Sequence, residues 1–520
     1  MVFVLAPATI VLMMMVLVAI AVQETARRRR KHQKQQYFQG TATTPTASSD
    51  DLEIAKPTPP PGPTPLPFVG NLLSLRKHSE CPYQGFSELK DKYGPVYSLK
   101  LGSSSAVIVN TYDTIKEVLV NKANSFDARP DLTRFKLYFG GDRQHSLALC
   151  DWSDHQKRRM TLARSFLMFR GQEDHFTKFE ANVVSEMPTL TTEFDKVLGQ
   201  PVEAKEILSY CALNIFTGYM CSKKFQYEQS DFQKLVQNFD YIFRDINTGH
   251  IIDFLPSLEP LFPSYINEIK KNASDIREHI LNNICLEKYE KLRQNPNDVE
   301  DLVDACFANL LTENEGEKWD WQTILYIVED LLGGSMAISN IVMRLLGHIL
   351  QHPHVVQALR NEIDEKVGRE RAATLEDRHQ MLYSQAVLYE TLRLTSSPIV
   401  PHVATEDATV GGYSVEKGSI VFLNNFEMNT SPSLWDEPTK FMPERFLKDG
   451  CLKKPEYFIP FSTGKRSCVG SKVVANIAFL VVTTLLQRYD ISLAEGTPEL
   501  PRGKISLDWN PFKLVFAMRQ

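Results

Sequence analysis

The segment Phe461-Ser-Thr-Gly-Lys-Arg-Ser-Cys-Val-Gly470 constrains the fold of this chain most strongly, because it runs directly into the apolar stretch 473–486. It places Cys468 at the start of a long buried helix. There the positive end of the helix dipole and unpaired backbone N–H groups favour a thiolate over a thiol. Gly464 and Gly470 allow the unusual backbone angles and close approach of a tight loop. The segment therefore makes Cys468 a candidate metal ligand, with a buried free cysteine as the alternative.

Composition and missing motifs restrict the function further. The 520 residues include eight cysteines with no CxxC pair and no zinc-type spacing, so neither a disulfide scaffold nor a zinc module is expected. The net charge of −5 argues against a nucleic-acid binder that depends on a strong positive field. No GxGxxG or GxxxxGK[ST] motif occurs, so reducing equivalents must come from a partner.

Hydrophobic periodicity predicts a mainly α-helical catalytic domain with a small β region. Strand patterns flank a turn at Gly102, at 96–101 and 106–110, and recur within 403–423. Helical patterns occupy 113–121, 154–166, 275–293, 321–351, 353–367, 381–394 and 471–489.

The N-terminal region predicts a membrane anchor. Residues 1–22 contain no charge, and at 1.5 Å per residue a helix of that length spans about 33 Å, enough to cross a bilayer core. Basic residues follow at 27–31, which keeps the remainder cytosolic. We expect a transmembrane signal anchor at 1–23, a basic and low-complexity linker at 24–56, and a catalytic domain at 57–520 with a proline-rich hinge at 57–67. A cleaved signal peptide is the alternative.

The cysteine loop matches the haem-binding signature FxxGxRxCxG at every fixed position, and from the proline-rich segment to the C-terminus the chain resembles a cytochrome P450. The resemblance implies the cytochrome P450 fold and monooxygenase activity. It implies that Cys468 is the axial thiolate ligand of the iron of haem b, that Phe461 packs near the sulfur, and that Arg466 pairs with a haem propionate. Gly464 and Gly470 belong to the same cofactor-binding loop. Electrons would come from NADPH through a flavoprotein, NADPH-cytochrome P450 reductase.

Two further elements resemble the family. Glu390-Thr-Leu-Arg393 places an acid and a base on one helix face, and Phe441-Met-Pro-Glu-Arg445-Phe446 follows downstream. By itself the first would be an ordinary solvated ion pair. The resemblance implies a buried structural network of Glu390, Arg393 and Arg445 that holds the fold around the haem.

The expected contacts to the propionates are less regular. Trp152 occupies a family position, but the basic residue usual four places later is Gln156, so Lys157 or Arg158 is the candidate substitute. His402 occupies a strand position that often supports a propionate, with a surface histidine as the alternative. A basic face is expected to bind an acidic reductase, or to be merely solvated; its members are Lys157, Arg158, Arg159, Lys465, Arg466 and Lys472.

The stretch 321–351 departs from the family pattern. Gly333 and Gly334 cost helix stability, about 1 kcal/mol each relative to alanine, which close approach of haem or dioxygen would explain. With Ala337 they form the expected substrate and oxygen groove. The usual acid-threonine pair is replaced by Met336 and Ala337, neither of which relays protons.

Alternative proton routes are Ser335 or Ser339 with water, or a substrate hydroxyl. The stretch from Gly333 to Asn340 resembles the Spook-type Halloween branch of insect steroidogenic enzymes. That resemblance implies an early step of ecdysteroid synthesis on a cholesterol-derived sterol, in the endoplasmic reticulum membrane.

The alternatives are a haem-thiolate isomerase or dehydratase, which needs no dioxygen activation, and a monooxygenase of other lipophilic substrates. The absent acid-threonine pair favours the isomerase. Dependence on a reductase separates the isomerase from a monooxygenase. A hydrolase using Ser335 as nucleophile is disfavoured, because its motif requires a strand before the serine and here a helical pattern runs through it.

Overall fold

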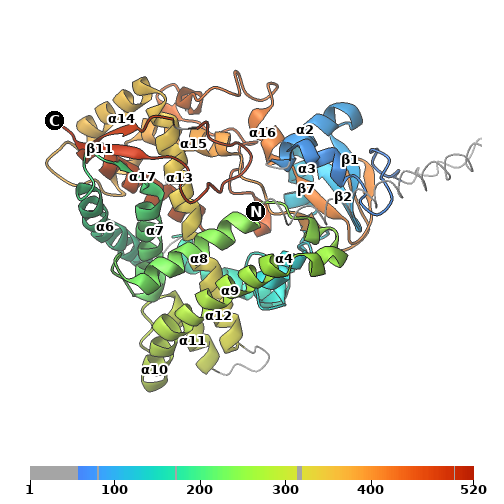
Figure 1. Ribbon diagram of the computed structural model, residues 1–520, viewed down its shortest axis with the longest axis horizontal. Helices are drawn as coiled ribbons and strands as arrows, with labels where there is room; N and C mark the ends of the chain where they lie inside the picture. Colours follow the sequence, from blue (N-terminus) through green and yellow to red (C-terminus); the bar gives the residue numbers. More distant parts are fainter. Residues whose placement is uncertain (1–56, 79–80, 170–172, 313–318, 497) are drawn as a thin grey trace, which may run out of the picture.

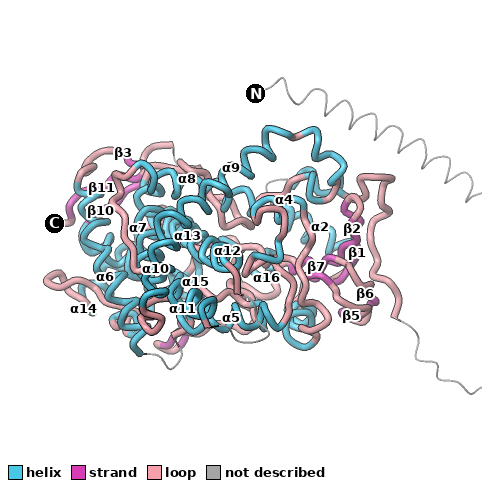
Figure 2. The backbone as a smooth tube through the Cα atoms, turned by 90° about the horizontal axis from the view of Figure 1, so that it is seen from below, coloured by secondary structure: helices cyan, strands magenta, loops and turns pink. Residues whose placement is uncertain are grey.

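The computed structural model describes residues 57–78, 81–169, 173–312, 319–496 and 498–520. The expected anchor at 1–23 and linker at 24–56 lie outside these residues. Helices make up most of the body, and small sheets lie at its two ends (Figure 1, Figure 2). The predicted class, mainly α with a small β region, is therefore confirmed.

The α-helices follow the chain as α2 (Pro82–Tyr93), α3 (Tyr112–Lys116), α4 (Thr133–Tyr138), α5 (Asp154–Leu167), α6 (Glu173–Asp195), α7 (Ala204–Cys221), α8 (Ser230–Ile246), α9 (Pro263–Ile280), α10 (Leu286–Gln294), α11 (Leu302–Leu311), α12 (Trp321–Gly333), α13 (Ser335–Leu350), α14 (Pro353–Lys366), α15 (Leu382–Thr395), α16 (Asn425–Thr430) and α17 (Ser471–Arg488). Short 3-10 or π turns are η1 (Leu72–His78), η2 (Glu117–Asn121), η3 (Arg143–His145), η4 (Ile251–Asp253), η5 (Pro256–Leu261), η6 (Leu281–Cys285), η7 (Asp377–His379), η8 (Pro443–Phe446) and η9 (Gly464–Arg466).

The strands are β1 (Val96–Leu101), β2 (Ser104–Val109), β3 (Pro201–Val202), β4 (His402–Val403), β5 (Ala408–Val410), β6 (Tyr413–Val415), β7 (Ile420–Leu423), β8 (Leu447–Lys448), β9 (Cys451–Leu452), β10 (Tyr489–Leu493) and β11 (Leu514–Met518). The largest sheet has the order β1-β2-β7-β4, a second has β10-β11-β3, and β5-β6 and β8-β9 are two-stranded.

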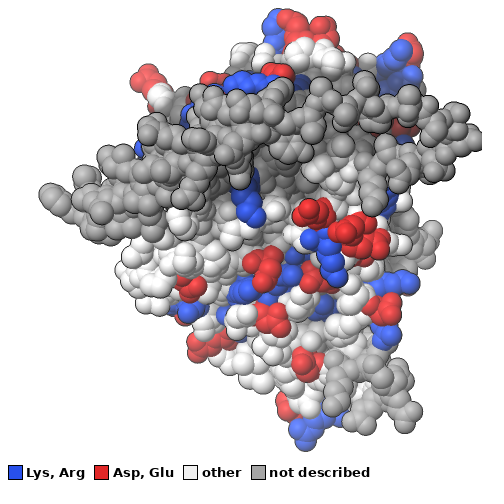
Figure 3. Space-filling model, turned by 90° about the vertical axis from the view of Figure 1, so that its right-hand side faces the viewer, with Lys and Arg blue, Asp and Glu red and all other residues white. Residues whose placement is uncertain are grey.

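The main sheet joins distant parts of the chain. β1 and β2 form the predicted antiparallel hairpin, and β2 pairs in parallel with β7, with Ala106 opposite Ile420. This pairing ties the N-terminal part of the described chain to its C-terminal third. The end of the molecule that carries β1, β2 and β7 faces the viewer in Figure 3, and its described residues show interspersed acidic and basic side chains.

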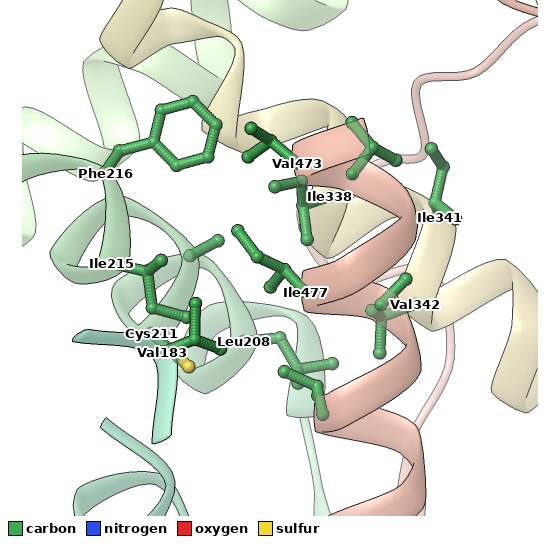
Figure 4. Packing of buried hydrophobic residues seen from close by; sticks show 14 of the residues in the cluster. Val183, Leu208, Cys211, Ile215, Phe216, Ile338, Ile341, Val342, Val473 and Ile477 are labelled. Atoms are coloured by element: carbon green, nitrogen blue, oxygen red, sulfur yellow. The ribbon is translucent and has the colours of Figure 1, made fainter. Parts of the chain in front are cut away.

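The core is built where α7, α13 and α17 pack together. Ile215, Ile338 and Ile477, one from each helix, are at most 1% exposed, and their neighbours point toward one another (Figure 4). Sequence periodicity missed α7 because that helix is buried nearly all round, which removes the alternation of polar and apolar faces. It also missed α2, α4, α6, α8, α11 and α16.

The predicted helix at 321–351 is two helices. α12 ends at Gly333 and α13 begins at Ser335, with Gly334 as the junction. Of the described helical stretches, Trp321–Leu350 is the one long and apolar enough to cross a membrane, but 72% of its most apolar window is buried in the protein. Together α12 and α13 form the centre of the core.

The proline-rich segment 57–67 lies against β1 of the main sheet and β6 of the small β5-β6 sheet. The Ser98 N–H donates to the Pro61 carbonyl (2.7 Å), and the Ser414 N–H donates to the Thr58 carbonyl (2.9 Å). A Cβ at Gly62 would lie 2.1 Å from the Ser98 carbonyl oxygen. The end of the expected hinge nearest the linker is therefore packed against the globule.

Candidate functional site: a cysteine-floored cavity

The cysteine loop is held in place by its backbone. The Cys468 N–H donates to the Phe461 carbonyl (3.0 Å), and α17 begins three residues later with Gly470 as its N-cap. Gly464 has φ +75°, and a Cβ there would lie 2.1 Å from the Leu119 carbonyl oxygen of η2. Gly464 thus packs the loop against η2. It does not line the cavity described next, so its place in the loop is structural in this geometry.

The loop forms one wall of an interior cavity of about 410 Å³. Most of the lining side chains are apolar. They come from the loop, from α5, α7, α8, α12, α13, α15 and α17, and from the segment after α15. Among them Phe216, Ile341 and Val473 belong to the core between α7, α13 and α17 that Figure 4 shows, so the cavity adjoins that core. Of the predicted site residues, Cys468, Phe461, Arg466, Gly470, Gly334 and Ala337 line it.

The sulfur of Cys468 is accessible from this cavity although the residue lies deep in the protein. Burial raises the pKa of the Cys468 thiol, and the Gly470 backbone N–H only partly opposes it. The effect expected of the helix N-terminus is therefore opposed, in the metal-free protein, by the loss of solvation. Desolvation outweighs a single backbone dipole, and a bound metal cation would reverse the balance.

A buried cluster of basic side chains lies beside the loop. Arg466 donates to the carbonyls of Ala148 (3.0 Å) and Cys150 (2.7 Å), but its Nη1 has no partner among the described residues. His402 Nδ1 donates to the Phe126 carbonyl (2.5 Å), and its Nε2 likewise has no partner there. Burial, followed by the nearby Arg129 charge, lowers the pKa of His402 well below its usual range.

Arg129 completes this cluster and was not identified from the sequence. It lines the cavity and donates to the carbonyls of Ala148 (3.2 Å), Val400 (2.9 Å) and Pro401 (3.1 Å). Burial and then the Arg466 charge lower the pKa of Arg129. An isolated arginine before a proline gives no sequence signal for this role. Buried cations that repel one another form a site for anionic groups.

Several predicted contacts lie elsewhere. Trp152 does not line the cavity; its ring lies 5.7 Å from the Arg466 guanidinium and 5.2 Å from Lys465 Nζ. Lys157 and Arg158 are exposed and outside the cavity, so the expected substitution by either of them is wrong. Arg129 takes the place next to Arg466 instead.

The basic face is also smaller than expected. Arg159 and Arg466 are buried, and Lys465 is paired with Asp127 at 2.6 Å. The remaining exposed members are Lys157, Arg158 and Lys472.

The structure brings Glu390, Arg393 and Arg445 together. Arg393 donates to both carboxylate oxygens of Glu390 (2.7 and 2.8 Å), and both side chains have 0% exposure. Arg445 Nε donates to the same carboxylate at 3.1 Å. The ring of Trp435, unforeseen from the sequence, lies 5.1 Å and 5.8 Å from the two guanidinium groups. This is a buried network and not a solvated pair.

On α12 and α13, Gly334 and Ala337 line the cavity, but Gly333 does not. Successive helix residues point about 100° apart, and a Cβ at Gly333 would face Phe239 of α8 at 3.5 Å. The inclusion of Gly333 in the groove is therefore wrong.

The serine route, one of the alternatives for proton delivery, gains no support from the positions of the two serines. The hydroxyls of Ser335 and Ser339 donate to the carbonyls of Leu332 (2.6 Å) and Met336 (3.1 Å). Both serines are buried, and neither lines the cavity. Asp330, one turn before Gly334, is the carboxylate among the described lining residues.

The sequence model of the cytochrome P450 family matches residues 60–516. The chain belongs to the cytochrome P450 family. It is 36% identical over 481 residues to "Cytochrome P450 307a1" of Drosophila melanogaster, which covers 87% of this chain and 88% of the relative. It is 30% identical to "Steroid 17-alpha-hydroxylase/17,20 lyase" of Mesocricetus auratus, covering 87% and 91%, and 29% identical to the Homo sapiens protein of that name, covering 87% and 89%.

This cytochrome P450 is therefore a haem-dependent monooxygenase that takes electrons from NADPH through a redox partner, as predicted. The cavity suits a haem. It offers one accessible sulfur, apolar walls, and two basic side chains on its lining, Arg129 and Arg466, the second with an unpartnered Nη1. His402 does not line the cavity, but it lies near both arginines, and its buried Nε2 is also unpartnered. These groups suit the two carboxylates of the cofactor.

Proposed function

We propose that this cytochrome P450 is a membrane-anchored monooxygenase that oxidises a sterol, at an early step of insect ecdysteroid synthesis. The observation that carries the proposal is the apolar cavity, which has Cys468 on one wall and Gly334 and Ala337 on another. The similarity to an insect cytochrome P450 and to steroid hydroxylases supports a steroid-like substrate.

Each site residue has a proposed role. Cys468 holds the haem iron as a thiolate, and the bound haem supplies the reductive activation of dioxygen. Arg466, Arg129 and His402 bind the propionates, with Trp152 stacked beside Arg466. Phe461 and Gly470 shape the sulfur environment. Glu390, Arg393 and Arg445 hold the underlying fold, and Gly334 and Ala337 leave room for substrate above the haem.

The proposed location is the endoplasmic reticulum, with 1–23 as a single-pass anchor and the catalytic domain in the cytosol. Phe68 and Leu261 are 71% and 51% exposed. Their segments are linked through the β1–β2 turn, where Gly102 N–H donates to the Val69 carbonyl and Ser103 N–H donates to the Phe254 carbonyl. These exposed apolar side chains support contact with lipid beside the anchor.

The proposed electron donor is NADPH-cytochrome P450 reductase, bound through Lys157, Arg158 and Lys472. Lys472 lies in the first turn of α17, four residues after Cys468. Charge reversal at Lys472 should slow reduction by the reductase at low ionic strength more than at high ionic strength. If the variant is reduced more slowly than the wild type by the same factor at both salt concentrations, or is not slowed at all, the docking site is wrong.

The test of function uses the full chain in detergent with reductase, NADPH, isotopically labelled dioxygen and 7-dehydrocholesterol. The proposal predicts a sterol product that carries the label. Product formed without label and without NADPH would establish the isomerase or dehydratase instead. The absence of a hydroxyl or acid at 336 and 337 is the observation that favours this second candidate.

A further inference from the structure

Asp330 lies on α12, on the side that faces the cavity and that α13 continues. Gly334, Ala337 and Ile341 line the same cavity at intervals of four, three and four residues, which is one face of a helix. The described lining residues contain no other carboxylate, and their other permanent charges are Arg129 and Arg466. Asp330 therefore brings the single carboxyl group among the described lining residues to a largely apolar chamber. Burial there raises the pKa of Asp330, and the hydrogen bonds from Ser146, Ala148 and Leu147 oppose that shift.

One oxygen of this carboxylate is fixed by the protein. Asp330 Oδ2 accepts hydrogen bonds from the Ser146 hydroxyl (2.7 Å) and from the backbone N–H groups of Leu147 (2.5 Å) and Ala148 (3.2 Å). These bonds set the orientation of the side chain. Oδ1 accepts no hydrogen bond from any described residue, and it is not among the fully buried unpartnered atoms, so it is accessible from the cavity.

A cavity-facing acceptor oxygen that receives no donor from the protein can accept one from a ligand, and such a hydrogen bond is stronger in an apolar chamber than in water. The surroundings select the kind of donor. Oδ2 already takes three donors, the Arg159 charge acts on Asp330, and Arg129 and Arg466 share the cavity. A cationic ligand would be repelled by these arginines, and an anionic ligand would be repelled by an ionised Asp330. An uncharged hydroxyl suits the site.

We propose that Asp330 Oδ1 accepts a hydrogen bond from a hydroxyl of the substrate and so fixes which end of the molecule reaches the haem. Asp330 and Ala337 are seven residues apart, or about 10 Å along the helix at 1.5 Å per residue. The substrate is then a lipophilic alcohol whose hydroxyl lies on the order of 10 Å from the carbon held beside Ala337. This deepens the proposed function and rests on it only in taking the cavity as the substrate site.

The test compares an alcohol with its methyl ether, which cannot donate. The full-length haem-loaded protein is titrated with 7-dehydrocholesterol and with its 3-methyl ether, and Kd is read from the substrate-induced shift of the haem spectrum. The wild type should prefer the alcohol about tenfold, the value of one hydrogen bond to a charged group. In Asp330→Asn the amide keeps one oxygen for the loop but presents N–H₂ in place of Oδ1, so the preference should fall below about twofold.

Ser146→Ala is the matched control, because it removes one bond to Oδ2 and leaves Oδ1 in place. It should retain the preference. Equal affinity of the wild type for alcohol and ether would overturn the proposal without any variant. An unchanged tenfold preference in a correctly loaded Asp330→Asn protein would also overturn it.

A second pair, farnesol and its methyl ether, separates this proposal from the sterol assignment. If neither sterol binds but the wild type prefers farnesol to its ether, and Asp330→Asn does not, the hydroxyl site stands and the sterol substrate is wrong. If the sterols bind without any dependence on Asp330, the sterol assignment stands and the hydroxyl site is wrong.

Discussion

Replacement of Glu390 by glutamine removes the one anion of a buried network that contains two arginines. The Glu390 carboxylate accepts hydrogen bonds from Arg393 Nε and Nη2, from Arg445 Nε and from the Met442 N–H. Glutamine has nearly the same shape, but it carries no charge and turns an N–H₂ group toward donors. Arg393 is fully buried and Arg445 is 7% exposed, so water cannot replace the lost anion.

Breaking a buried ion pair by removing one partner costs about 3–5 kcal/mol. That is a large part of the roughly 5–15 kcal/mol by which native proteins are stable. With a urea slope of about 3 kcal/mol per M, the unfolding midpoint should fall by about 1 M or more. Unfolding is followed by circular dichroism, and haem loading by the reduced carbon-monoxide difference spectrum.

The chain contains a matched control for this experiment. Glu290-Lys-Leu-Arg293 on α10 has the same i,i+3 pairing, at 3.5 Å, but its side chains are 57% and 64% exposed. Exposed pairs contribute at most about 1 kcal/mol, so Glu290→Gln should leave both the midpoint and haem loading nearly unchanged. The reasoning is refuted if the two variants shift the midpoint equally, or if Glu390→Gln folds and loads haem like the wild type.

Four further changes have distinct expected outcomes. Cys468→Ala should bind little haem, and a normal thiolate spectrum at wild-type haem content would disprove its assigned role. Arg129→Gln should weaken haem binding about tenfold or more. It also removes the donor to the carbonyls of Ala148, Val400 and Pro401, so the haem-free protein should lose some stability as well. A variant that loses stability but not haem affinity would contradict the assigned role of Arg129. Ala337→Thr should load haem normally and give no large gain in product per NADPH consumed, whereas such a gain would show that a hydroxyl at 337 limits the natural enzyme. Burial raises the pKa of Glu329 to about 8 from 4.5, against the opposing charge of Arg277. Folding therefore favours the protonated form, and the stability of the protein falls as the pH rises from 4.5 through 8. Glu329→Gln should flatten this fall in thermal unfolding, and an unchanged pH profile would exclude Glu329 as its source.

The sequence allowed the cysteine loop and the helix behind it to be predicted because both are local. Gly464, Cys468 and the start of α17 lie within a few residues of one another, and their spacing carries the geometry. The β1–β2 hairpin is local in the same way. The pairing of β2 with β7 joins residues more than 300 positions apart, and no sequence pattern indicated it.

The remaining site residues depend on burial, which a single sequence does not display. Glu290-x-x-Arg293 and Glu390-x-x-Arg393 look alike as motifs, and only their surroundings make the second a buried network. Arg129 and Asp330 face the cavity because loops from other parts of the chain pack against them. Gly333 and Gly334 are neighbours in sequence, yet only Gly334 faces the cavity, because helix rotation separates their directions.

The most direct test of the central claim is one incubation of the full chain with reductase, NADPH, labelled dioxygen and 7-dehydrocholesterol, after the reduced carbon-monoxide spectrum has established a thiolate-bound haem. The account predicts one labelled oxygen atom in a sterol product, formed only when reductase and NADPH are present. A sterol product that lacks the label, formed equally without reductase, would contradict it.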